Sequence, residues 1–174
     1  MLCLLHTLLM GDVEMKKLSW NTYATWILFT EVVGALSGWL TREGTRQYRA
    51  DPAIREPMLS PPGFVFPIVW VILFALMGVG AARIYASPPS AGRSHSLALF
   101  FLQLAFNFFW SILFFNLQAF GTALIWLVIL WVLILGMIIS FGAVDKTAAL
   151  LQVPYLLWVT FAAYLNYGIW SMNR

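Results

Sequence analysis

The segment Gln103-Leu-Ala-Phe-Asn107-Phe-Phe-Trp110-Ser-Ile-Leu-Phe114 places two amides within an apolar run. On a helix, its polar side chains and two of its aromatic rings fall on one face, because they are spaced by three or four residues: Gln103, Asn107, Trp110 and Phe114. A polar side chain at membrane depth normally turns toward neighbouring helices or an internal cavity. We therefore expect this face to point toward other helices of a bundle and not toward lipid.

The overall composition is that of a membrane protein. Hydrophobic residues make up 61% of the chain and charged residues 10%, and the mean hydropathy is +0.83. A soluble domain has about 25% charged residues. The apolar residues form long uninterrupted blocks, which is typical of an all-α integral membrane protein. The net charge of +3 is small and no basic stripe is present, so no nucleic-acid partner is expected.

Five apolar segments of membrane-spanning length predict a bundle of five transmembrane helices in the bilayer. A single domain is expected over residues 15–174, with helices at about 20–40, 64–86, 97–117, 121–143 and 148–171. Residues 1–14 are interpreted as a disordered tail or an upstream start, because Met15-Lys16-Lys17 is a more natural beginning. The single cysteine, Cys3, excludes an internal disulfide, and His6 and His95 are too far apart to suggest a zinc site.

The connection between the first two predicted helices, residues 41–63, is long and polar, with four arginines and four prolines. Such a loop beside short turns predicts a lid or binding loop, and a solvated linker is the alternative. Lysines and arginines are divided equally between the two sides of the predicted bundle, so sidedness is not decided. Their clustering in this loop favours a cytoplasmic location for it.

The first predicted helix carries Glu31 near its middle. A charged side chain there is costly, so we expect Glu31 to face inward, to be protonated or to lie near an interface. Gly34 and Gly38 have the small-xxx-small spacing that permits close helix packing. The fourth predicted helix is apolar on nearly every side, which predicts a lipid-facing wall.

Two further helices repeat the pattern of large rings and a few polar atoms. In the second helix the aromatic face carries Phe66, Trp70 and Phe74, and in the fifth helix Trp158, Ala162 and Asn166 are spaced by four. Together with the face of the third helix, these residues predict a pocket for a large, flat, mostly apolar ligand. Packing of the rings against one another is the alternative.

Three sequence motifs resemble those of the tryptophan-rich sensory protein family, which includes the mitochondrial translocator protein or peripheral benzodiazepine receptor. They are Ser60-Pro-Pro-Gly-Phe-Val-Phe-Pro-Ile-Val-Trp70, Gln103-Leu-Ala-Phe-Asn-Phe-Phe-Trp110 with Phe114-Phe115, and Val153-Pro-Tyr-Leu-Leu-Trp158 through Leu165-Asn-Tyr167. The resemblance runs from about Trp20 to the end of the chain. It implies a five-helix bundle, commonly a homodimer, that binds porphyrins such as protoporphyrin IX and haem. The resemblance also implies binding of sterols, in some members, and of isoquinoline carboxamide or benzodiazepine ligands.

The ligand-binding residues implied by the resemblance, with Gln103 added from the helical face described above, are Pro61, Trp70, Phe74, Gln103, Asn107, Trp110, Trp158 and Ala162. Trp70 and Trp158 also match the two tryptophans associated with porphyrin breakdown in bacterial members. The sequence departs from the family at Leu59, where a tryptophan usually precedes the double proline. It also has only Tyr48 where a Trp-Tyr pair is expected, so the contact made by the loop is left open.

The function expected first is a membrane receptor or sensor that binds porphyrins, with a contribution to tetrapyrrole transport or regulation. One alternative is a light- and oxygen-dependent porphyrin-degrading enzyme that uses Trp70 and Trp158, although no acid–base pair or nucleophile is evident. Another is a small-molecule transporter, but the sequence has no internal repeat and no intramembrane carboxylate beyond Glu31. A porphyrin is expected as ligand, and no cofactor or metal is expected.

Overall fold

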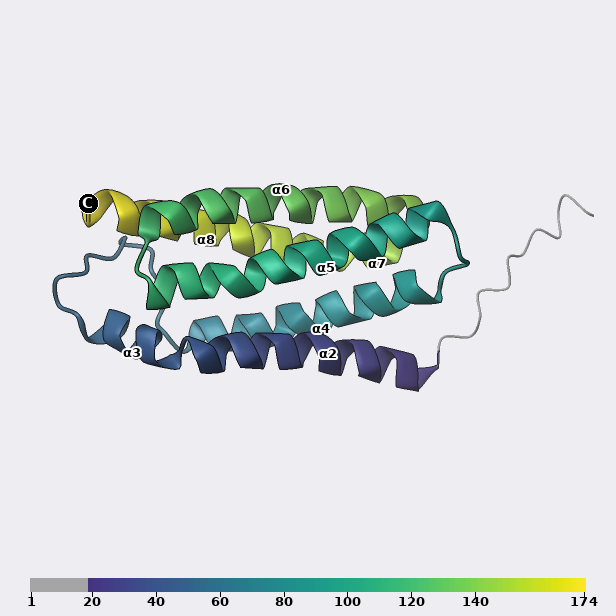
Figure 1. Cartoon of the computed structure of the whole chain (residues 1–174), viewed down its shortest axis with the longest axis horizontal. Helices are drawn as coiled ribbons and strands as arrows, with labels where there is room; N and C mark the ends of the chain where they lie inside the picture. The colour runs from purple at the N-terminus through teal and green to yellow at the C-terminus, as the bar shows by residue number, and fades with distance from the viewer. Residues whose placement is uncertain (1–18) are drawn as a thin grey trace, which may run out of the picture.

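The computed structural model describes residues 19–174, so the interpretation of residues 1–14 and the start at Met15-Lys16-Lys17 lie outside the described residues. Within this range every regular element is helical, and the long helices run side by side (Figure 1). The elements are α2 (Trp20–Leu40), α3 (Arg42–Ala50), α4 (Val65–Ala86), α5 (Ala91–Ser111), the π-helix η1 (Ile112–Asn116), α6 (Phe120–Val144), α7 (Lys146–Leu150) and α8 (Val153–Met172).

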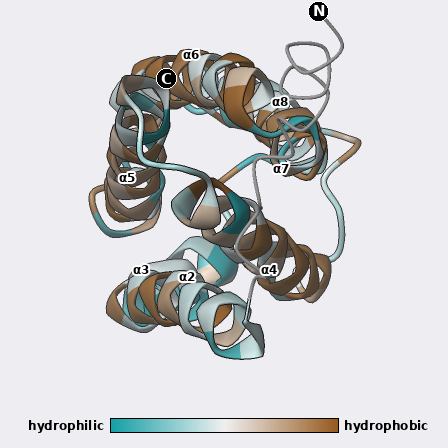
Figure 2. Ribbon diagram, turned by 90° about the vertical axis from the view of Figure 1, so that its right-hand side faces the viewer, coloured by the Kyte–Doolittle hydropathy of each residue, from teal (hydrophilic) through white to brown (hydrophobic). Residues whose placement is uncertain are grey.

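The predicted five-helix membrane bundle is confirmed. Four segments are each long and apolar enough to cross a membrane: Val65–Ala86, Ala91–Asn116, Phe120–Val144 and Lys146–Met172. The fifth is α2, which passes the same test together with α3 as a pair bent by 52°. Figure 2 looks along the bundle and shows the apolar residues concentrated on the long helices, with more polar residues in the loops.

The long polar connection differs from a simple loop, because α3 forms within it. Arg42–Ala50 is a polar helix that buries only Gly44 and Tyr48, which lie one turn apart on the same face. A Cβ on Gly44 would lie 2.6 Å from the Phe115 carbonyl oxygen, so the glycine allows α3 to pack closely against η1. The sequence predicts a polar loop over residues 41–63, whereas the structure has a helix in its first part, because Gly44 and Tyr48 pack against η1.

The ends of two other helices also differ from the predicted bounds. The third spanning helix begins earlier, at Ala91, because the Ser90 hydroxyl accepts a hydrogen bond from the Arg93 amide and caps the helix. The last spanning segment is divided into α7 and α8. The Asp145 carboxylate caps α7 and pairs with Arg83 at 2.8 Å, whereas Pro154 lies in the first turn of α8, where its missing N–H costs little.

The main apolar core lies between α4, α5, α6 and α8, in the half of the bundle away from α3. The face of α6 that points into this core carries Leu127, Leu130 and Ile134, while Ile125 and Ile139 on its other side are exposed. The predicted lipid-facing wall therefore describes only the outer side of α6. Close packing joins α5 to α6, α2 to α4 and α6 to α8, but α4 and α8 are not among the closely packed pairs.

Candidate functional site

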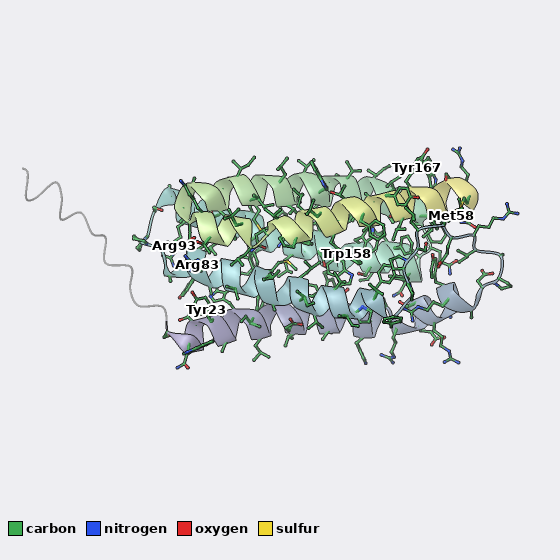
Figure 3. The ribbon with its side chains drawn as sticks, turned by 180° about the vertical axis from the view of Figure 1, so that it is seen from behind. Tyr23, Met58, Arg83, Arg93, Trp158 and Tyr167 are labelled. Atoms are coloured by element: carbon green, nitrogen blue, oxygen red, sulfur yellow. The ribbon has the colours of Figure 1, made fainter. Side chains whose placement is uncertain are left out.

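A cavity of about 1340 Å³ occupies the half of the bundle nearer α3. Its lining side chains come from α2, α3, the loop after α3, α4, α5, η1 and α8, and none comes from α6 or α7. Figure 3 shows Trp158 about midway along the bundle and Met58 at the loop end. The cavity therefore extends from the middle of the bundle toward the loop.

Aromatic side chains of α4 and α8 form two walls of the cavity. Trp70 lies beside Phe74 with ring centroids 5.5 Å apart, and Phe66 meets Trp158 edge to face at 5.8 Å. Ala162, one turn after Trp158, is small and leaves room beside the indole. Helical spacing brings these residues together, because rings four residues apart on facing helices point into the same space.

The wall formed by α5 is held by hydrogen bonds between polar side chains. The Asn107 amide nitrogen donates to the Tyr155 hydroxyl at 3.0 Å, and the Trp110 indole N–H donates to Asn166 Oδ1 at 3.3 Å. The Asn166 amide nitrogen in turn donates to the Phe120 carbonyl at 2.8 Å. Since these partners fix the side chains, the wall is preformed.

Gln103 does not line the cavity, although it shares a helical face with Asn107. It is fully buried, and its Oε1 accepts a hydrogen bond from the Tyr155 hydroxyl at 2.9 Å. Its Nε2 lies 3.9 Å from the Met77 sulfur. Gln103 thus orients Tyr155, which holds Asn107, and its own polar atoms are used within the protein. The other predicted ligand-binding residues all line the cavity: Pro61, Trp70, Phe74, Asn107, Trp110, Trp158 and Ala162.

The loop and α3 cover the end of the cavity. The ring of Tyr48 packs against Phe114 and Phe120, with centroids 5.5 and 6.2 Å away. Burial raises the pKa of the Tyr48 hydroxyl, and the Glu56 carboxylate raises it further, so this hydroxyl stays neutral. The Arg49 guanidinium donates to the Gly63 carbonyl at 3.1 Å and joins α3 to the end of the loop.

The same loop is attached to the end of α8. The Arg55 amide donates to the Asn173 side-chain oxygen at 2.8 Å, and the Asn173 amide nitrogen donates back to the Arg55 carbonyl at 2.9 Å. Pro57 packs so closely on Gly168 that a Cβ there would overlap it. These contacts across the chain favour a covering loop over a passive linker. Leu59, where the family usually has tryptophan, is 63% exposed and does not line the cavity.

A second, shallower groove of about 510 Å³ lies between α4 and α8. Its lining is almost entirely apolar and includes Ile72, Pro154 and Phe161. Trp158 lines both this groove and the central cavity. The indole of Trp158 therefore lies at the boundary between the ligand-sized cavity and an apolar face of the bundle.

Several lining residues were not assigned from the sequence. Most belong to α2, η1 and α3, where no regular spacing of aromatic residues identifies them in the sequence. They are Glu31, Gly34, Ser37, Thr41, Arg42, Tyr48, Arg49 and Phe115. Charge distinguishes Glu31 in the sequence, and spacing distinguishes Gly34 and Gly38. Their position beside the cavity follows only from the packing of α2. Within residues 19–174, no group of three or more His, Cys, Asp or Glu side chains is arranged to hold a metal ion.

The fold and the cavity define a class: multi-pass α-helical membrane proteins with an aromatic chamber inside the bundle. The TspO/MBR family model matches residues 26–171, and the chain belongs to this family. It is 40% identical over 119 residues to the tryptophan-rich protein TspO of Chlorobaculum tepidum, covering 68% of this chain and 75% of the relative. It is 34% identical to the tryptophan-rich sensory protein of Cereibacter sphaeroides, covering 69% and 74%. The translocator protein of Bos taurus is 30% identical over 89% of this chain and 92% of its own length.

Proposed function

We propose that this protein is a membrane receptor or sensor whose cavity binds porphyrins such as protoporphyrin IX and haem. Membership of the TspO/MBR family supports the receptor or sensor role in a membrane. The observation that carries the porphyrin proposal is the cavity of about 1340 Å³ with aromatic walls from three helices. Pockets for drug-sized ligands typically enclose about 300–1000 Å³, so the cavity has room for a larger flat molecule.

The charges of the cavity suit an amphiphilic ligand of this shape. The indoles of Trp70 and Trp158 offer flat apolar surfaces on which a macrocycle stacks. At the opposite end, Arg42 and Arg49 line the cavity where the loop covers it, together with Asp51 and Glu56. Guanidinium groups bind carboxylates well, so we infer that the propionates of a porphyrin lie beside these arginines and that the macrocycle lies deeper in the bundle.

The first test blocks the cavity from α2. A Cβ on Gly34 would overlap the ring of Phe74, and both residues line the cavity, so this wall of the cavity must change shape. We expect Gly34→Ala to weaken protoporphyrin IX binding about tenfold, which is about 1.4 kcal/mol of binding free energy. Quenching of tryptophan fluorescence during titration of the purified protein measures the affinity.

Gly38→Ala is the matched control, because a Cβ at this cavity-lining glycine meets no atom within 4 Å. It should bind protoporphyrin IX as the unsubstituted protein does. Equal affinities for the two alanine variants would argue against a ligand beside Phe74. A failure of the unsubstituted protein to bind protoporphyrin IX would refute the porphyrin proposal itself.

The same aromatic walls support binding of isoquinoline carboxamide ligands, which are flat and apolar with one amide. Competition between such a ligand and protoporphyrin IX is the direct measure of a shared cavity. Sterol binding and the homodimer stay predictions from the resemblance.

Light-dependent breakdown of a bound porphyrin is the second candidate function. It is favoured by one observation, that Trp70 and Trp158 line the same cavity. With oxygen as the oxidant and the porphyrin as light absorber, we expect Trp70→Phe to slow the loss of porphyrin absorbance under illumination at saturating ligand by about tenfold or more. Trp131→Phe is the control, because its indole donates to Thr160 on the surface away from the cavity. If porphyrin absorbance is lost at the same rate in the unsubstituted protein, Trp70→Phe and Trp131→Phe, the breakdown proposal is refuted and only the binding proposal stands.

A further inference from the structure

The inner end of the cavity carries a carboxylate. On each lining helix, the residue farthest from the loop forms the cavity floor, which we define as Glu31 of α2, Phe74 of α4, Asn107 of α5 and Trp158 of α8. The floor therefore combines two aromatic rings, an amide and one acidic side chain.

Glu31 is separated from the other charged groups of the cavity. These groups, Arg42, Arg49, Asp51 and Glu56, all lie at the end covered by the loop. At a rise of about 1.5 Å per residue, Glu31 lies about 15 Å along α2 from Thr41, where that end begins. Among the described residues the ion pairs are Arg46 with Glu43 and Arg83 with Asp145, and neither includes Glu31.

Two polar side chains, one on the floor and one next to Glu31 in α2, donate hydrogen bonds to other groups. The Asn107 amide nitrogen donates to Tyr155, and the Thr30 hydroxyl donates to the Phe74 carbonyl at 2.8 Å. In the part of the chain that the structure describes, no side chain donates a hydrogen bond to the Glu31 carboxylate. A carboxylate at membrane depth is costly unless it is paired, and it is retained where it has a functional partner. A partner that enters the cavity would supply the missing charge.

We propose that Glu31 recognises a protonated amine carried by a flat, largely apolar ligand. The ammonium group pairs with the carboxylate at the floor, and the apolar body stacks on the indoles of Trp70 and Trp158. Because the surroundings are apolar, the pair is stronger here than at a water-exposed surface. This inference rests on the proposed function, since it assigns a ligand class to the same cavity.

The test compares two flat probes that differ in one group, 1-pyrenemethylamine and 1-pyrenemethanol. Both are titrated against the full-length protein in nanodiscs of zwitterionic lipid, and pyrene fluorescence measures binding. We expect the unsubstituted protein to bind the amine about tenfold more tightly than the alcohol, a difference of about 1.4 kcal/mol. Glu31→Gln should remove this preference while the affinity for the alcohol stays unchanged, which also reports an intact cavity.

Glu43→Gln is the matched control, because Glu43 lies on the exposed surface of α3 and does not line the cavity. It should keep the full preference for the amine. The inference is overturned when the unsubstituted protein binds both probes equally, or when Glu31→Gln or a second variant, Glu31→Ala, still prefers the amine. Equal binding of both probes alongside normal protoporphyrin IX binding overturns the role of Glu31 alone. If the unsubstituted protein binds neither pyrene probe and does not bind protoporphyrin IX, the proposal of a ligand-binding cavity is refuted.

Discussion

Trp158→Ala should weaken protoporphyrin IX binding by about tenfold to a hundredfold, which corresponds to about 1.4–2.8 kcal/mol. The indole is part of the cavity floor and also borders the groove between α4 and α8. Its removal deletes a flat stacking surface and an edge-to-face contact with Phe66 at 5.8 Å. It also joins the two spaces, so the ligand is less well enclosed. The affinity is best followed by the change in porphyrin absorbance, because the substitution itself removes a fluorophore.

Trp20→Ala provides the comparison for this experiment. Trp20 is 85% exposed in the first turn of α2, at the end of the bundle away from the cavity. Its removal should leave the porphyrin absorbance titration unchanged. If Trp158→Ala and Trp20→Ala bind with the same affinity, the porphyrin does not occupy the space beside Trp158.

Gly78→Ala should lower the free energy of unfolding by about 1–3 kcal/mol through overpacking. Gly78 lies where α4 crosses α2, and an added Cβ would come within 2.6 Å of the Ile27 Cα and 2.8 Å of the Trp26 carbonyl oxygen. These are backbone atoms, which cannot rotate away, so the two helices must separate. Thermal unfolding in detergent, followed by circular dichroism, should show a clear decrease in Tm.

Gly136→Ala tests whether the loss of stability in Gly78→Ala arises from the contact between α4 and α2 or from the replacement of glycine by alanine itself. Gly136 lies within α6, and a Cβ there meets no atom within 4 Å. Alanine favours helix over glycine by about 0.5–1 kcal/mol, so this variant should be as stable as the unsubstituted protein or more so. A similar loss of stability in both variants would show that the contact between α4 and α2 is not the cause.

The predictable part of the site is the direction in which side chains point around each helix. Spacings of three and four residues placed Trp70, Trp158 and Asn107 on faces that the structure brings to one cavity. Gln103 shares the face of Asn107 and was assigned to the ligand for that reason. It lies one turn farther from the loop, where the Tyr155 hydroxyl from α8 takes its hydrogen-bonding capacity. Periodicity gives the angle of a side chain around a helix, but not the partner that it meets.

The amino-acid sequence by itself determined the spanning segments and their apolar and aromatic faces, because both depend on local composition and on the helical repeat. Only the tertiary structure decided that α3 forms in the long connection, since its burial depends on contacts between Tyr48 and η1. It also decided that Glu31 lies at the cavity floor and that Gly34, but not Gly38, touches Phe74. These features depend on the crossing angles of the helices and on the distances between their axes. Both are set by packing between segments that are distant in sequence.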